Sequence, residues 1–174
     1  METQKNTTAK TALNFGLILG GISVLYGLML YALEMHYQGE TGTSLIGYAL
    51  LIGVILWAIL HFKKTNDGYI SLSEALKTGG GTALISAIII SIYAIIVIKY
   101  LDPEFMDKSI EYKKQKLIQE EPEIPLENVN KMFEMQKEFS GPFIISGFII
   151  ILNLFFGFLI SLIAGLIVKK SKPE

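Results

Sequence analysis

The sequence predicts an all-α protein: an integral membrane four-helix bundle with an extracytoplasmic amphipathic helical hairpin between helices three and four of the bundle. The first observation behind this prediction is a composition that is 51% hydrophobic and only 18% charged. The second is that Asp, Glu, Lys and Arg are absent from four long windows, residues 11–33, 41–62, 78–98 and 139–168. The third is the charge-rich segment, residues 99–138, that separates the last two windows.

Each charge-free window is long enough to cross a bilayer as one helix. The windows contain 23, 22, 21 and 30 residues, and about 20 helical residues cross a hydrocarbon core of about 30 Å. A helix in water would carry polar residues along one face. The isoleucine-rich residues 87–98 favour a strand by propensity, but a strand in lipid leaves backbone groups unpaired unless a barrel closes. We therefore expect a single membrane domain over residues 1–174, with spans at about 12–33, 44–62, 79–98 and 142–168.

The distribution of lysine predicts how the chain threads. On one side of the membrane the short segments are rich in lysine. The short loop on the other side, residues 34–40, has no lysine and two glutamates. Because short cytoplasmic segments collect positive charge, both termini are expected in the cytoplasm. The first window is too long for the apolar core of a signal peptide and no A-x-A pattern follows it, so we expect it to remain as the first span. The short segments on the predicted cytoplasmic side hold eight lysines: Lys5, Lys10, Lys63, Lys64, Lys77, Lys169, Lys170 and Lys172.

The start of the third span contains a helix cap and three successive glycines. Ser71 and Glu74 have the S-x-x-E spacing of a capping box, which predicts an interfacial cytoplasmic helix at about 71–78. The following "KTGGGT" is not a phosphate-binding loop, because such a loop places its lysine after the glycines and follows a strand. Gly79–Gly81 are expected either to kink the chain or to let a neighbouring helix approach closely. Whether the third helix continues through them is left open.

The long charged segment predicts a helical hairpin at about 103–140. Asp102 is expected to cap its first helix, with Pro103 at the first helical position. Pro122 and Pro125 end that helix, and a second amphipathic helix starts at about Leu126. We expect the hairpin to lie on the outer membrane surface or to stand above it.

Small residues form one face along the first and fourth spans. Helices in lipid associate through such faces because their backbones come close together. The faces predict either packing within one bundle or self-association, and we favour the first because four spans need interfaces. The side-chain amide of Asn153, near the middle of the membrane, is expected to form a hydrogen bond with a neighbouring helix, at Tyr93 or Ser23. The helix-packing candidates are Gly16, Gly20, Ser23 and Gly27 in the first span and Asn153, Gly157, Ser161 and Gly165 in the fourth.

The residue types argue against several kinds of chemistry. The chain has no cysteine, and therefore no thiol nucleophile and no thiolate metal site. His36 and His61 are predicted on opposite sides of the membrane, and no H-E-x-x-H motif is present. No charged residue lies within a span, which argues against proton-coupled transport. The net charge of −1 gives no reason to expect nucleic-acid binding. We expect no catalytic, cofactor-binding or metal-binding residue, no cofactor and no enzyme activity.

Several segments occur together, in one order, in a known family. In order they are "TALNFGLILGGISVLYGLMLY", "DGYISLSEALKTGGGTALISAIIISIY", "DPEFMDKSIEYKKQKL" and "KMFEMQKEFSGPF". The chain resembles, over nearly its whole length, the bacterial membrane family catalogued as domain of unknown function 4199. The resemblance implies four helices in a bacterial inner membrane and no established activity, so no catalytic residue carries over. Its most specific residues are Gly68, Ile70, Ser71, Glu74, Ala75, Asp102–Phe105 and Pro142.

Three functions are compatible with these features. We expect a non-catalytic interaction or assembly subunit, whose partners are the lipid bilayer and either a second copy or another membrane protein, with no nucleic acid. The alternative is a pore or carrier for a small solute, which would need a polar path lined by Asn153, Ser23, Ser86 and Tyr93. The third is a membrane enzyme acting on lipid, which would need Glu34, His36 or His61 gathered in a cleft with a second polar group.

Overall fold

The computed structural model describes residues 7–171, and secondary structure in that range is helical apart from one isolated backbone bridge. The all-α fold with four long apolar helices is therefore confirmed. The elements are α1 (Thr8–Ala32), α2 (Thr41–Thr65), α3 (Leu72–Ile96), the π-helical turn η1 (Val97–Leu101), α4 (Phe105–Glu120), α5 (Leu126–Glu138) and α6 (Pro142–Val168).

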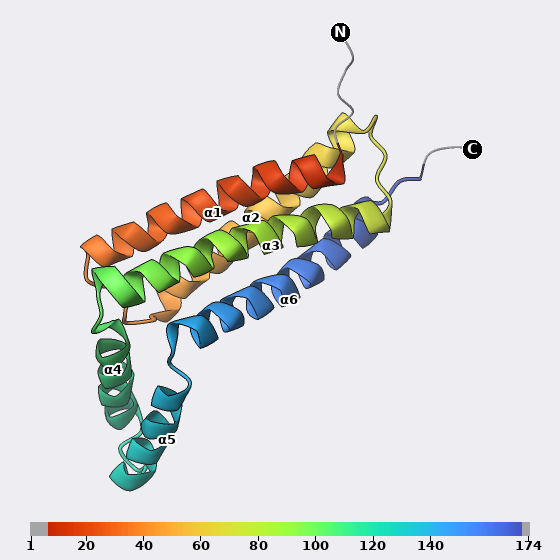
Figure 1. The fold of residues 1–174 in the computed structure, drawn as a ribbon. Coiled ribbons are helices and arrows are strands. Elements are labelled where there is room, and N and C mark those ends of the chain that lie inside the picture. Colours follow the sequence, from red (N-terminus) through yellow and green to blue (C-terminus); the bar gives the residue numbers. More distant parts are fainter. Residues whose placement is uncertain (1–6, 172–174) are drawn as a thin grey trace.

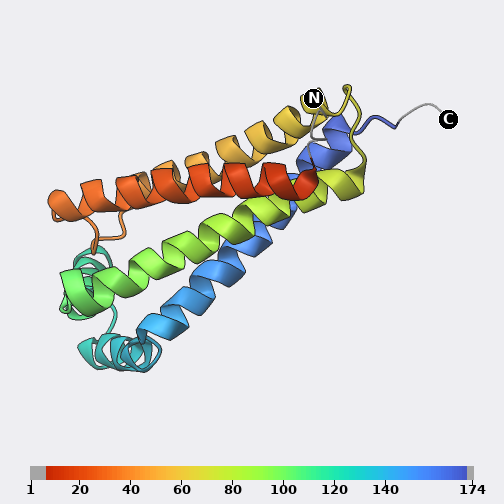
Figure 2. The ribbon, with the colours of Figure 1, turned by 45° about the horizontal axis from the view of Figure 1, so that its top comes forward.

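The four long helices form a bundle in which α3 is central. It packs along most of its length against α1 on one side and α6 on the other, and α2 contacts all three. Both views show α1 and α6 close together at the end that holds the chain termini and farther apart at the end that bears α4 and α5 (Figures 1 and 2). We call these ends the terminal end and the hairpin end.

The terminal end is tightly packed. Ile55, Ala58 and Ile59 of α2 are fully buried there, in the same cluster as Ile70, which precedes α3. The backbone of Ile70 also pairs with that of Lys170 in an antiparallel bridge, which ties the start of α3 to the end of α6. This end of the bundle is closed by apolar packing and backbone hydrogen bonds.

The small-residue faces of α1 and α6 lie inside the bundle. A side chain added at Gly16 or Gly20 would meet Ile85 or Ile89 of α3, and one at Gly27 would meet Tyr93. Close contact between backbones is what these glycines provide, so the residues serve packing within one chain. On α6, Gly157 faces Ala83, Ser161 is fully buried against Gly79, and Gly165 faces Leu72 and Ala75.

The glycine triplet does not interrupt α3, which is helical from Leu72 to Ile96. Gly79 faces Ser161 of α6 and Gly81 faces Ala12 of α1, whereas nothing lies within 4 Å of a side chain added at Gly80. Two of the three glycines thus let neighbouring helices approach α3 from opposite sides. Ser71 and Glu74 form a reciprocal capping box at the start of this single helix, rather than of a separate interfacial one.

The start of α4 differs from the sequence prediction. Asp102 does not cap the helix, whose N-cap is Glu104, because the carboxylate of Asp102 is taken up by two other side chains. The π-helical turn brings it there: the Asp102 amide donates to the carbonyl of Val97, five residues back, at 2.8 Å. α4 and α5 then pack on each other, with Val129 of α5 buried between them.

The outward faces of the four long helices are apolar. Leu25, Trp57, Ile92, Ile151 and Ile167 are each more than half exposed, and many other large apolar side chains share this surface. A soluble monomer does not keep such a continuous apolar surface in water. The four helices are 25 to 30 residues long and apolar enough to cross a membrane, and together with this surface they indicate a membrane protein.

Candidate binding sites at the hairpin end

Two recesses lie at the hairpin end. The polar pocket has a volume of about 740 Å³ and lies between the end of α1, the α1–α2 loop and α4. The bundle cavity has a volume of about 350 Å³ and lies between α1, α2, α3 and α6 in the half of the bundle nearest the hairpin.

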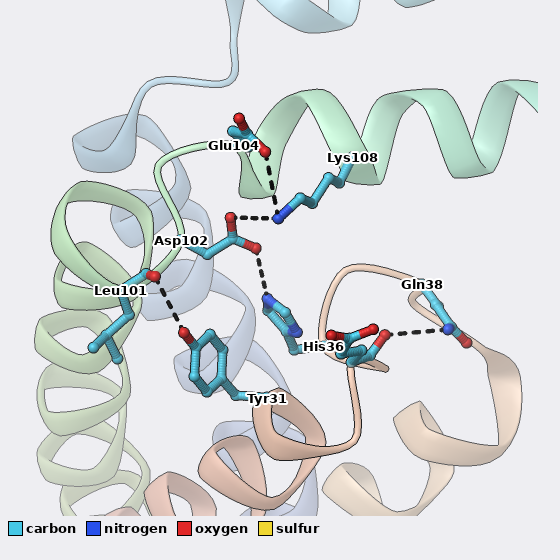
Figure 3. A network of polar contacts seen from close by, with 8 residues as sticks. Tyr31, His36, Gln38, Leu101, Asp102, Glu104 and Lys108 are labelled. Atoms are coloured by element: carbon cyan, nitrogen blue, oxygen red, sulfur yellow. Dashed lines mark hydrogen bonds and ion pairs between the residues drawn. The ribbon is translucent and has the colours of Figure 1, made fainter.

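The wall of the polar pocket contains a polar network of three side chains, His36, Asp102 and Lys108 (Figure 3). The His36 Nε2 lies 3.0 Å from Asp102 Oδ2, and the Lys108 ammonium donates to Asp102 Oδ1 at 2.9 Å. Burial of the Asp102 side chain, which is 8% exposed, tends to raise the pKa of its carboxyl, but the hydrogen bonds from Lys108 and His36 outweigh burial and lower that pKa. Asp102 therefore remains ionised and binds the α1–α2 loop to α4.

Aromatic rings enclose the His36 imidazole. The ring of Phe105 stacks on it, with centroids 5.6 Å apart, and Tyr31 and Tyr37 meet it edge-on. The Tyr31 hydroxyl also donates to the carbonyl of Leu101 at 3.2 Å. Because of this packing, the His36 Nδ1 is buried and has no partner within residues 7–171.

A second contact fastens the same loop to α4. The hydroxyl of Tyr112 donates to Glu40 at 2.5 Å, and the ammonium of Lys116 donates to both oxygens of that carboxylate at 3.1 Å. The hydrogen bond from Tyr112 is the main cause of the lowered pKa of the Glu40 carboxyl, and that from Lys116 comes next. The α1–α2 loop is thus fastened at two points, at His36 in its middle and at Glu40 where α2 begins.

The carboxylates left over give the polar pocket an acidic character. The carboxylate of Glu34 has no partner within the described chain, and that of Glu111 accepts only from Gln115 on the next turn of α4, at 2.9 Å. Glu34 also has a backbone φ of +55°, which a non-glycine residue rarely adopts. Beside these acids, the wall presents Tyr31, Tyr37 and Tyr112.

The bundle cavity is mainly apolar and has a few polar groups. Its wall includes Leu19 of α1, Leu51 of α2, Ile90 of α3 and Phe156 of α6. The fully buried Ile55 and Ile59 lie on α2 one and two turns beyond Leu51, so the cavity ends at the packed terminal half. Its polar lining residues are Ser23, Tyr26, Ser44, Tyr48 and Asn153.

The comparisons with known proteins bear on the family alone. The model of a family described as "Protein of unknown function (DUF4199)" matches residues 14–170. The chain belongs to this family. No curated protein and no solved structure matches this DUF4199 protein.

The structure of this DUF4199 protein brings together only some of the residues that the sequence singled out. Ser23 and Asn153 both line the bundle cavity. Ser86, by contrast, donates to the carbonyl of Ala83 within α3, and Tyr93 packs on Gly27, so the four residues do not form one polar path. The Asn153 amide nitrogen donates to the carbonyl of Ile149 on its own helix, at 2.9 Å, and not to a neighbouring helix.

The two histidines lie at opposite ends of the bundle. His36 shares the polar pocket with Glu34, whereas His61 lies near the terminal end, where its ring contacts Phe15 at 5.2 Å between centroids. Sequence reasoning missed the contact of Asp102 with His36, 3.0 Å between Oδ2 and Nε2, and the hydrogen bond from Tyr112 to Glu40. Glu34, Glu40 and Asp102 all lie just beyond charge-free spans. This position indicates that polar groups gather at one end of the spans, but it does not indicate which of them pair.

Proposed function

We propose that this DUF4199 protein is a non-catalytic membrane subunit that binds a partner protein through the polar pocket. The observation that carries the proposal is the double attachment of the α1–α2 loop to α4, at His36–Asp102–Lys108 and at Glu40–Tyr112–Lys116. A loop held at two points is pre-organised, and a pre-organised surface loses little entropy when it binds.

The chemistry of the wall selects a basic partner. Tyrosine supplies flat contact area at interfaces and attracts cations to its ring face. Glu34 and Glu111 add carboxylates that no lysine neutralises within residues 7–171. A lysine or arginine side chain of a second membrane protein is therefore the anchor that this pocket suits. The threading of the chain puts the pocket outside the cytoplasm in this proposal, because the lysine-rich short segments are at the other end.

The state of His36 supports a role without catalysis. A general base must offer a ring nitrogen within hydrogen-bond reach of its substrate. Nε2 already bonds Asp102, and Nδ1 is buried. The residues that line the pocket, moreover, include no serine, threonine or cysteine that could act as a nucleophile.

The proposal is tested by photocrosslinking in native membranes. A photoreactive side chain is placed at Gln115, which lines the pocket, and in a matched control at Asn130, an exposed amide on α5 away from it. We expect one crosslinked protein from Gln115 only, and its loss in the variant Glu34→Gln/Glu111→Gln. A Gln115 crosslink that survives this double variant, or equal products from both positions, would refute recognition through the pocket.

A further inference from the structure

We propose that the bundle cavity is a second binding site, which takes up a lipophilic molecule bearing a hydroxyl or carbonyl group from the membrane. The inference is independent of partner binding at the polar pocket. The bundle cavity is a recess that opens at the bundle surface, where Gly47, Tyr48 and Leu152 of its wall are exposed. Its volume of about 350 Å³ falls within the size range of ligand sites.

The walls decide the class of molecule. Apolar side chains from all four long helices supply most of the lining, so the body of the molecule is apolar. In hydrocarbon, however, a polar group without a partner is costly. The Ser23 hydroxyl donates to no partner within residues 7–171 and the Asn153 Oδ1 accepts no hydrogen bond there, and both side chains are half-buried, whereas Ser44 and Tyr48 are exposed.

These free groups match a hydroxyl. The Ser23 hydroxyl can donate and accept, whereas the free amide oxygen of Asn153 can only accept. A ligand hydroxyl can do both and therefore satisfies either group, and a carbonyl can accept from Ser23. Tyr26 is already engaged, because its hydroxyl donates to the carbonyl of Thr43 at 3.0 Å.

The shape of the bundle decides the side of access. α1 and α6 diverge toward the hairpin end (Figure 2), and the cavity lies in that half. At the other half, Ile55, Ala58 and Ile59 are fully buried and leave no passage. The molecule thus enters from the leaflet on the hairpin side and is retained rather than passed across the membrane.

Two glycines of α2 provide a matched pair of variants. A side chain added at Gly47 or at Gly53 meets nothing within 4 Å, so both positions accept a larger residue without a clash. Only Gly47 lines the cavity. Gly47→Leu therefore fills the cavity, whereas Gly53→Leu makes the same chemical change on the same helix outside it.

The experiment uses the full chain in lipid nanodiscs and a ten-carbon alcohol with a diazirine in its alkyl chain, beside the corresponding diazirine alkane. We expect the alcohol to label the cavity wall, with labelling suppressed by excess 1-decanol and not by decane. Gly47→Leu should abolish labelling and Gly53→Leu should leave it unchanged. Asn153→Leu, which keeps the side-chain volume, should weaken labelling about tenfold, as the loss of one buried hydrogen bond does.

Three results would overturn the inference. Unchanged labelling in Gly47→Leu would put the probe elsewhere. Equal labelling by the alcohol and the alkane would mean an unselective void. No labelling of the wall at all would mean that water or lipid chains fill the cavity. Circular dichroism and thermal unfolding of each variant check that it keeps its fold, and Ser23→Ala gives a second, smaller change at the same wall.

Discussion

Replacing the three glycines of α3 one at a time by alanine should give effects of opposite sign. In Gly80→Ala the new methyl group meets nothing within 4 Å. Alanine in a helix interior is about 0.8–1 kcal/mol more favourable than glycine, so Gly80→Ala should stabilise the bundle by up to about 1 kcal/mol.

At Gly79 and Gly81 the same methyl group collides with a neighbouring helix. Its carbon would lie 2.9 Å from the Cβ of Ser161 at position 79 and 2.8 Å from that of Ala12 at position 81. Both atoms are fixed to a backbone, so the helices themselves must move apart. Overpacking costs about 1–3 kcal/mol, and after the propensity gain of about 1 kcal/mol the net destabilisation is roughly 0–2 kcal/mol. Because the propensity gain is the same at both positions, Gly79→Ala and Gly80→Ala should differ by the packing cost alone, about 1–3 kcal/mol.

Unfolding in mixed micelles, followed by circular dichroism while dodecyl sulfate replaces the mild detergent, measures this difference. Gly80→Ala is the internal control, because it changes helix propensity equally and packing not at all. Equal midpoints for the three variants would show that α1 and α6 do not contact α3 at these glycines. That result would refute the central position of α3 in the bundle.

Three further predictions concern the hairpin end. Asp102→Asn should cost about 2–3 kcal/mol, because two charge-assisted hydrogen bonds are lost, and should speed hydrogen exchange in the α1–α2 loop; Asp107→Asn, which breaks only an exposed ion pair, should do neither. The pKa values of the Asp102 and Glu40 carboxyls are lowered from their ordinary values of 3.8 and 4.5, so the stability that these carboxylates contribute is complete above about pH 5 and is lost as the pH falls through their folded-state pKa values. Hydrogen exchange in the α1–α2 loop, corrected for intrinsic rates, should therefore be constant near neutral pH and rise in acid. A constant exchange rate down to about pH 3 would contradict this. Val129→Asp, at a side chain that is 1% exposed between α4 and α5, should open the hairpin to protease, whereas Met132→Asp, at 56% exposed, should not.

The long helices and the family could be predicted from the sequence because their signals are local. A single charge-free window of more than 20 residues can cross lipid only as a helix. The motifs that resemble the family lie in short stretches of sequence. The small-residue faces could be located for the same reason, because helical periodicity alone aligns Gly16, Gly20 and Gly27. The choice between packing within one chain and self-association could not be made from periodicity. It depends on the positions of Ile85, Ile89 and Tyr93 on α3.

The candidate sites could not be predicted because they depend on distant contacts. His36 and Asp102 are 66 residues apart, and nothing near either residue predicts the other. Local rules even give Asp102 a different role, since an aspartate before a proline is a strong helix cap. The π-helical turn shifts its carboxylate toward the loop, where the Lys108 ammonium and the His36 ring bind it in place of the free amides of α4.

The division of the bundle into a closed and an open half has a cause in the composition of α2. Its second half carries Leu51, Val54, Ile55, Ala58 and Ile59, whose side chains fill the space between the other three helices. Its first half is rich in glycine and hydroxyl residues that fill little volume, and the open side of Gly47 is part of the cavity wall. From the closed end, α1 and α6 diverge on either side of α3 toward the hairpin end (Figure 2), and the bundle cavity lies in that half. The bundle cavity follows from this asymmetry, since it lies where α2 stops filling the bundle, whereas the polar pocket is built by the end of α1, the α1–α2 loop and α4.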